Sequence, residues 1–241
     1  MSEKERIELP EEEPEREKED KEAPKEEDVK QRIDNFGVFN NVFSFDSDFQ
    51  YLTIIGSVEG HTTLPPNNKT TKYENLIPQL VAVEENPRVK GLLTILNTVG
   101  GDVEAGLAIA ELVATMSKPT VSLVLGGGHS IGIPLATASS YSFIAESATM
   151  TLHPIRMTGL IIGAEQTYGY FRKMQDRITD FIVRTSRADR EIIERLMRST
   201  DDMANDVGTI LYGREAVEMG LIDEVGGLEK ALGKLKSMSG S

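Results

Sequence analysis

One stretch decides the fold: Val121-Ser122-Leu123-Val124-Leu125-Gly126-Gly127-Gly128-His129-Ser130-Ile131-Gly132. Its apolar first half is typical of a buried β-strand, and its glycines predict a tight turn where that strand ends. Ser130 lies in the turn, where small neighbours let a substrate carbonyl approach and backbone N–H groups can face a developing oxyanion. The stretch therefore indicates a serine nucleophile at the end of a buried strand.

The histidines indicate which kind of serine site this is. The motif Gly128-x-Ser130-x-Gly132 matches the nucleophile elbow of α/β-hydrolases. In that family the triad residues follow one another along the chain in the order Ser, acid, His. Here only His153 follows Ser130, and Glu146 is the one acid between them. A Ser130–His153 pair must take its acid from beyond His153, so the chain order excludes that family.

Strand-like and helix-like segments alternate on both sides of this stretch. The strands are expected over 51–58, 91–97, 120–125, 141–145 and 149–153, and the helices over 73–85, 103–116, 131–140 and 165–185. A further helix follows, with Ser186 as its expected cap. The alternation predicts an α/β fold with a parallel sheet covered by helices.

Four segments, in this order and spacing, resemble the proteolytic subunit of the Clp protease family. They are Leu92–Gly106, Gly128–Gly132, Met150–Pro154 and Gly213–Asp223. The resemblance extends from about Phe49 to Gly227. It implies the ClpP/crotonase-like fold, with stacked parallel β-strands, covering helices and a protruding helical handle over 165–185. It also implies hydrolysis of peptide bonds inside a homo-oligomeric ring, a hexamer or heptamer that can stack, with an unfoldase ATPase as a possible partner.

The resemblance assigns the catalytic roles. Ser130 is the expected nucleophile and His153 its base, 23 residues later at the next strand end. The expected oxyanion donors are the backbone N–H groups of Gly101 and Ile131. Val99 stands where the family has a proline, so the glycine turn is expected to be less rigid.

The acid of the triad is expected just before the closing helix. An ungapped alignment on that helix puts Gly208 at the acid's place, so the segment differs from the family pattern. Asp206 lies nearest and is the chosen catalytic acid, with Asp202 and Asp201 as alternatives. An acid is needed there because it holds the imidazole tautomer and stabilises the imidazolium.

Composition limits the other function classes. The net charge is −13, and residues 1–30 hold 14 acids and 7 bases. Such a segment buries too little apolar surface to fold alone, so we expect an acidic disordered head over 1–34 and a peptidase domain over 35–241. The sequence contains no dense cluster of basic residues, and this disfavours nucleic-acid binding. The most apolar window, 119–138, contains glycines and a histidine, which predicts no transmembrane span, and no signal peptide is recognised.

Two other function classes stay open at this point. One is a non-catalytic scaffold of the same fold that assists protein export, and the other is a crotonase-type thioester enzyme. For the leading hypothesis we expect polypeptide substrates, a cytoplasmic location and neither cofactor nor metal. The absence of cysteine excludes disulfides and cysteine ligation and fits a reducing compartment. The apolar stripe Phe171, Met174, Ile178, Phe181 and the segment Gly159–Gly163 are expected to serve ring assembly.

Overall fold

The computed structural model describes residues 47–156, 163–200 and 207–240. The predicted acidic head, the acids Asp201, Asp202 and Asp206, and most of the segment Gly159–Gly163 lie outside these residues. The strands are β1 (Phe49–Glu59), β2 (Thr70–Lys72), β3 (Gly91–Gly101), β4 (Thr120–Gly128), β5 (Tyr141–Ile144), β6 (Thr149–Leu152), β7 (Thr209–Tyr212) and β8 (Glu224–Val225). The helices are α2 (Tyr73–Glu85), α3 (Val103–Ala114), α4 (Gly132–Thr137), α5 (Ala164–Thr185), α6 (Arg190–Arg198), α7 (Gly213–Glu218) and α8 (Leu228–Met238).

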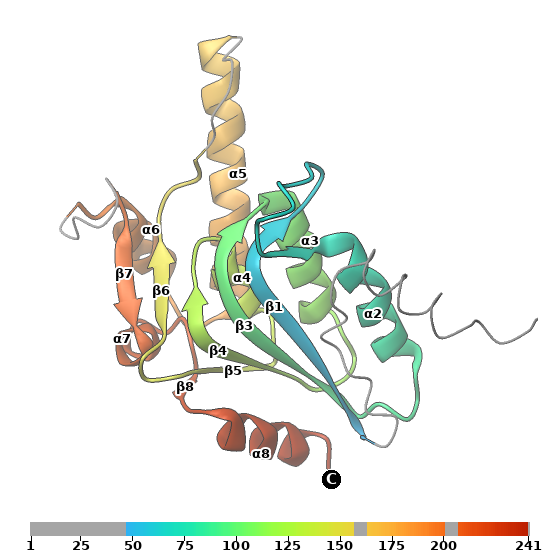
Figure 1. Ribbon diagram of the computed structural model, residues 1–241. Coiled ribbons are helices and arrows are strands. Elements are labelled where there is room, and N and C mark those ends of the chain that lie inside the picture. Colours follow the sequence, from blue (N-terminus) through green and yellow to red (C-terminus); the bar gives the residue numbers. More distant parts are fainter. Residues whose placement is uncertain (1–46, 157–162, 201–206, 241) are drawn as a thin grey trace, which may run out of the picture. The chain divides into compact units, whose positions relative to one another are not determined.

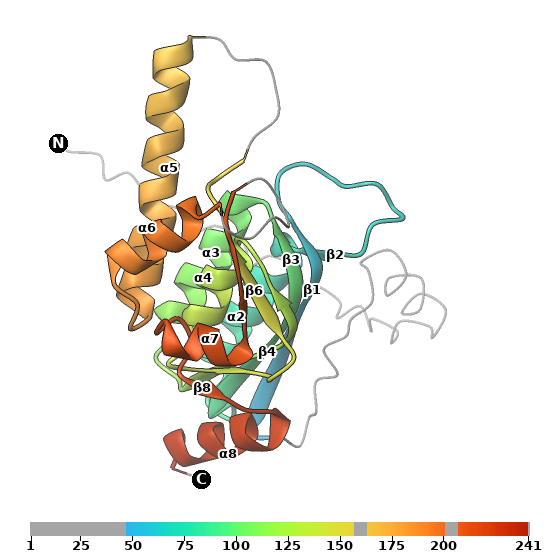
Figure 2. The ribbon, with the colours of Figure 1, turned by 90° about the vertical axis from the view of Figure 1, so that its left-hand side faces the viewer.

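The main sheet is parallel and has the order β2-β1-β3-β4-β5-β8 (Figure 1). Its central strands are apolar on both faces because both are covered. One core lies against α2, α3, α4 and α5, and a smaller one lies against α8. Figure 2 shows α8 apart from the other helices, at the amino end of β3. The predicted α/β class with a parallel sheet is confirmed.

β4 leaves the main sheet at its end, and this departure positions Ser130. The pairing of β3 with β4 shifts register between Leu96 and Thr98, and Asn97 Oδ1 accepts a hydrogen bond of 3.0 Å from the Gly127 N–H. Gly127 then pairs with Thr149 of β6, which in turn pairs antiparallel with β7. The end of β4 therefore lies beside the start of β6, and the turn after β4 reaches the end of β6, where the Ser130 N–H donates to the Thr151 carbonyl.

Two expectations about helices need correction. The helix after α5 begins at Arg190 with Asp189 at its N-cap, so Ser186 does not cap it. The Ser186 hydroxyl donates instead to the Ile182 carbonyl at 2.7 Å, at the end of α5. On α5, Met174, Ile178 and Phe181 are buried within the chain's own core. An Ile178→Asp change would therefore damage that core and would not isolate ring docking.

The first half of α5 reaches beyond the sheet (Figures 1 and 2). Its aromatic side chains there are open to solvent, with Tyr168 69% and Tyr170 52% exposed. This part of the helix matches the predicted protruding handle. Among the described residues no helix is long and apolar enough to cross a membrane.

Candidate active site

Ser130 has an unusual backbone conformation. Its φ is 56°, and no other non-glycine residue in the described part of the chain has a positive φ. Such a conformation costs about 1–3 kcal/mol and is found mostly at functional sites. It is held from both sides, because the Ser130 N–H donates to the Thr151 carbonyl at 2.9 Å and its own carbonyl accepts from Ile133 at 3.0 Å. The turn between β4 and α4 thus holds the hydroxyl in one place.

The two glycines after β3 approach this turn closely. A Cβ on Gly100 would lie 2.7 Å from the Ser130 Cβ and 3.3 Å from its Oγ. A Cβ on Gly101 would lie 2.2 Å from the Val58 carbonyl oxygen, and both glycines have positive φ. Glycine is therefore required at both positions. The backbone at 100–101 can come beside Ser130 only because it carries no side chain.

Thr98 stabilises the glycine turn, in which Val99 stands at the position of the family's proline. Its hydroxyl donates to the Gly56 carbonyl at 2.6 Å and accepts from the Gly100 N–H at 3.0 Å. Val99, which stands at the family's proline position, is 67% exposed and contributes little packing. The turn is thus fixed by a buried hydroxyl instead of a ring.

The predicted oxyanion donors both line one recess with Ser130. Ile131 is 2% exposed, and its side chain packs against Gly106. The N–H groups of Gly132 and Ile133 donate to the carbonyls of His129 and Ser130. Within the described residues, the Ile131 N–H has no partner. Buried N–H groups without an acceptor are rare in folded proteins, and a bound oxyanion would supply the acceptor here.

His153 also lines the recess, at the end of β6. Its Nδ1 lies 2.7 Å from the Pro154 carbonyl oxygen. A carbonyl only accepts, so Nδ1 must carry the proton of the neutral ring, and Nε2 is left with its lone pair. This is the tautomer that a general base needs. Between the described atoms of Ser130 and His153 there is no hydrogen bond.

Gly208 lies directly against His153. A Cβ at Gly208 would lie 2.9 Å from the His153 Cβ and 2.3 Å from the Leu152 carbonyl oxygen. No acidic side chain fits at this position, which explains why the ungapped alignment finds a glycine there. The predicted acids Asp206, Asp202 and Asp201 precede it, outside the described residues.

His129 is not among the residues that line the recess. Its Nδ1 lies 2.9 Å from the Thr151 hydroxyl, and its Nε2 lies 2.6 Å from where a Cβ on Gly127 would be. Burial lowers the pKa of His129, and charge on His153 lowers it further. His129 is thus a packed side chain beside Ser130 whose neutral form is favoured by burial.

The recess has a volume of about 190 Å³ and mostly aliphatic walls. Its apolar side chains come from α3, α4, α5, α6 and the end of β6: Val103, Ile131, Ile133, Leu152, Ile155, Ile178, Ile182 and Met197. Arg156 lines it as well. A space of this size and lining accepts one aliphatic side chain next to the nucleophile.

Gln175 is a contributor that sequence reasoning missed. Its Oε1 accepts a 2.8 Å hydrogen bond from the Ile155 N–H, and its Nε2 donates to the Met197 sulfur at 3.0 Å. It ties the loop after His153 to α5 and α6. Nothing in the sequence distinguishes it, because a glutamine on a long polar helix is an ordinary surface residue.

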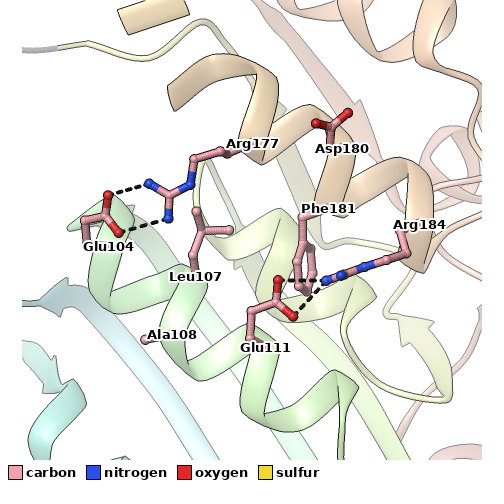
Figure 3. Close-up of a pocket in the computed structure, with 8 residues that line it drawn as sticks. All are labelled: Glu104, Leu107, Ala108, Glu111, Arg177, Asp180, Phe181 and Arg184. Carbon is pink, nitrogen blue, oxygen red and sulfur yellow. Dashed lines mark hydrogen bonds and ion pairs between the residues drawn. The ribbon is translucent and has the colours of Figure 1, made fainter. Parts of the chain in front are cut away.

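A second recess, of about 380 Å³, lies between α3 and α5 (Figure 3). Arg177 forms a two-pronged pair with Glu104, at 2.6 and 3.1 Å, and Arg184 binds both carboxylate oxygens of Glu111 at 2.8 Å. The hydrogen bond from Arg177 lowers the pKa of Glu104 and raises that of Arg177. The four charges satisfy one another, so this recess joins two helices and presents no candidate chemistry. The described residues contain no cluster of side chains fit to hold a metal ion.

Comparisons with known proteins show which family the chain resembles. A model of the Clp protease family matches residues 51–229. The chain is 57% identical over 208 residues to the translocation-enhancing protein TepA of Halalkalibacterium halodurans, covering 86% of this chain and 81% of that protein. It is 27% identical over 140 residues to the ATP-dependent Clp protease proteolytic subunit 1 of Chlamydia muridarum, covering 56% of this chain and 69% of that subunit. It is 26% identical over 146 residues to the ATP-dependent Clp protease proteolytic subunit of Leuconostoc citreum, covering 58% and 72%.

Proposed function

Because the chain belongs to the Clp protease family, we propose that it is a serine peptidase that cleaves polypeptides through Ser130 and His153. The observation that carries the proposal is the strained Ser130, in one recess with a histidine whose Nε2 is free to accept a proton. A serine hydroxyl is a weak nucleophile until a base takes its proton, and neutral imidazole does this near neutral pH.

The proposed reaction has two halves. Ser130 Oγ attacks the substrate carbonyl carbon while His153 Nε2 takes the hydroxyl proton. The Gly101 and Ile131 N–H groups stabilise the resulting oxyanion. His153 then gives its proton to the leaving amine as the C–N bond breaks, which leaves an acyl group on Ser130. Water, deprotonated by His153, releases the acid product and restores the serine.

We propose Asp206 as the acid of the triad. The supporting observation is the contact of Gly208 with His153, since a residue two positions earlier is within about 7 Å of Gly208 along the chain. The role would be to hold the Nδ1 proton and stabilise the imidazolium, a task that the Pro154 carbonyl performs only in part. Asp202 and Asp201 are the alternatives.

We further propose that the working form is a homo-oligomeric ring in the cytoplasm. Family membership supports the ring, and the exposed handle tyrosines are the surface we assign to contacts between copies. Light scattering on the full chain at micromolar concentration should give the mass of a hexamer, a heptamer or a stack of these. A monomer under these conditions would contradict the proposal.

A link to protein export is a second proposal, taken from the name of the TepA relative. It includes the alternative that the chain acts as a non-catalytic scaffold, which the missing hydrogen bond between the described Ser130 and His153 favours. Catalytic hydrogen bonds are often long in free enzymes and tighten when substrate binds, so we retain the peptidase as the main proposal.

Labelling with a fluorophosphonate separates these two alternatives. The probe should modify the wild type at Ser130 and leave Ser130→Ala unmodified. His153→Gln should be labelled more slowly by about a hundredfold, since a general base contributes about that much. Ser237→Ala, which changes an exposed serine on α8, serves as the matched control. An unlabelled but folded wild type would instead support the scaffold.

A further inference from the structure

The carboxyl end of β4 contains two residues more than the part of β3 beside it. The pairing of β3 with β4 passes from Leu96 and Val124 directly to Thr98 and Gly128. One residue of β3, Asn97, therefore faces three residues of β4. Extra residues of this kind bend a strand and are frequent next to active sites, where they redirect a side chain. We call this part of β4, residues 125–127, the β4 bulge.

The side chain of Asn97 spans the β4 bulge. Its Oδ1 accepts a hydrogen bond of 3.0 Å from the Gly127 N–H. A Cβ on Gly126 would lie 2.5 Å from the same oxygen and 3.1 Å from Nδ2, so the amide packs directly on bare backbone. The polar group that holds the bulge thus comes from a side chain of β3, and any side chain at position 126 would have to displace it.

The β4 bulge leads directly into the turn that carries Ser130. Beyond the bulge, the His129 N–H donates to the Thr98 carbonyl of β3 at 3.2 Å. The Ser130 N–H then donates to the Thr151 carbonyl of β6 at 2.9 Å. The chain is therefore held by β3 on one side of the turn and by β6 on the other.

The bulge sets where Ser130 lies along the sheet. In an unbroken ladder, Thr98 would pair with residue 126 instead of Gly128. Ser130 would then lie two residues farther along β3, a shift of about 6.6 Å. We propose that Asn97 is a positioning residue, which holds the β4 bulge and so places the Ser130 hydroxyl in the recess with His153.

Asn97 acts on Ser130 only through the backbone. Its side chain is exposed, and it is not among the residues that line the recess. Its replacement removes little packing and leaves the recess walls in place, so a slower Ser130 would report a displaced turn. The inference rests on the proposed peptidase function, because it assigns a role in placing the nucleophile of that reaction.

Two measurements on the full-length protein test the proposal. One is the rate of fluorophosphonate labelling at Ser130. The other is hydrogen exchange, measured by mass spectrometry on overlapping peptides of residues 123–131, which requires no catalysis. Asn97→Ala removes the acceptor, and Asn97→Asp retains an acceptor oxygen on a side chain of the same length. Asn67→Ala, at an exposed residue between β1 and β2, is the matched control.

In Asn97→Ala, labelling should slow about tenfold, the factor that corresponds to one lost hydrogen bond, and exchange over residues 126–130 should become faster. Asn97→Asp should label within about threefold of the wild-type rate, because its carboxylate accepts the Gly127 N–H. On a leucyl peptide ester, Asn97→Ala should lower kcat with little change in KM. Thermal unfolding of both variants should stay within about 4 °C of wild type.

A double-mutant cycle tests the contact with Gly126. Gly126→Ala should also slow labelling, because the new methyl group displaces the Asn97 amide. In the variant that combines Asn97→Ala with Gly126→Ala this collision is absent, so its labelling should be no slower than in Asn97→Ala alone. Losses that multiply in the combined variant would show that the two residues act independently, against the proposal.

The outcomes separate this inference from the proposed function. A folded wild type that is not labelled removes the peptidase, while exchange over residues 126–130 still shows whether Asn97 holds the turn. Equal exchange in Asn97→Ala and wild type overturns the positioning role. The role is also overturned by faster exchange with an unchanged labelling rate, and by an equal loss of labelling in Asn97→Ala and Asn97→Asp.

Discussion

At the scale of single residues, the site depends on backbone segments that pass so close to their neighbours that no side chain fits between them. Gly100 and Gly101 pass so close to Ser130 and Val58 that a methyl group at either position would collide with them. Ser130 in turn accepts a strained φ of 56°. These features are linked, because the strained serine turn and the bare glycine turn lie against each other.

A Gly100→Ala change tests this link. The new methyl group would lie 2.7 Å from the Ser130 Cβ and would also be strained by a φ of 93°. Displacement of the nucleophile by a fraction of an ångström should slow fluorophosphonate labelling about a hundredfold while circular dichroism shows a retained fold. The control is Gly233→Ala on α8, where a Cβ meets nothing within 4 Å. Labelling at the wild-type rate in Gly100→Ala would refute the close approach.

His129 gives the protein a pH dependence of its own. Its pKa in the folded state is lowered by burial from the ordinary 6.5, so the unfolded chain binds that proton more readily. Well above pH 6.5, this lowered pKa does not change the free energy of unfolding. As the pH falls below 6.5, it reduces the free energy of unfolding.

Urea unfolding at about pH 7.5 and 5.5 should therefore show a lower unfolding free energy at the lower pH. In His129→Gln the difference between the two conditions should shrink. The pKa of the Glu104 carboxyl group is lowered from 4.5, so its protonation reduces the free energy of unfolding only at a more acidic pH. An unchanged difference in His129→Gln would contradict the assignment.

At the scale of elements, α5 contacts both halves of the site. Gln175 holds the loop after His153, and Arg177 pairs with Glu104 in the first turn of α3, just after Gly101. Exposed ion pairs of this kind contribute about 0.2–1 kcal/mol, so the half-buried Gln175 contact carries more of the positioning.

A Gln175→Leu change should reduce kcat about tenfold with a small effect on KM, because the Ile155 N–H loses its acceptor and the histidine loop shifts. Gln175→Glu retains an acceptor oxygen and should recover most of the activity. The readouts are kcat and KM on a leucyl peptide, together with thermal unfolding. Equal activities in the two variants would show that Gln175 only supports packing.

Sequence reasoning placed the strands and the handle, because each has a local signal, while the catalytic roles of Ser130 and His153 stay predictions. Apolar runs indicate strands, glycines indicate turns, and the order of Ser and His limits the family; the family and the fold class are confirmed. Ser186 was wrong as a cap because its hydroxyl bonds to the preceding helix. Gln175 could not be found, since its hydrogen bonds to Ile155 and Met197 join segments that are distant in sequence. The acid, Asp206, stays a prediction.

At the scale of the whole molecule, the described part contains a complete core on each face of the sheet. We predict that residues 1–34 contribute to neither, because they contain too few apolar side chains to pack. Removal of this head should therefore shift the melting temperature by less than about 4 °C, the change that 1 kcal/mol causes in a domain of this size. Differential scanning calorimetry of the full and shortened chains measures it, and a larger fall would show that the head packs on the domain.

The central claim is that Ser130 carries the acyl group of a cleaved substrate. The most direct measurement is acid quenching of the full-length protein during turnover of a leucyl peptide ester, followed by peptide mapping by mass spectrometry. The account predicts an added acyl mass on the segment that contains Ser130, absent in Ser130→Ala and slow to form in His153→Gln. Hydrolysis of the ester by wild type and Ser130→Ala at equal rates, with no acyl mass on Ser130, would contradict it.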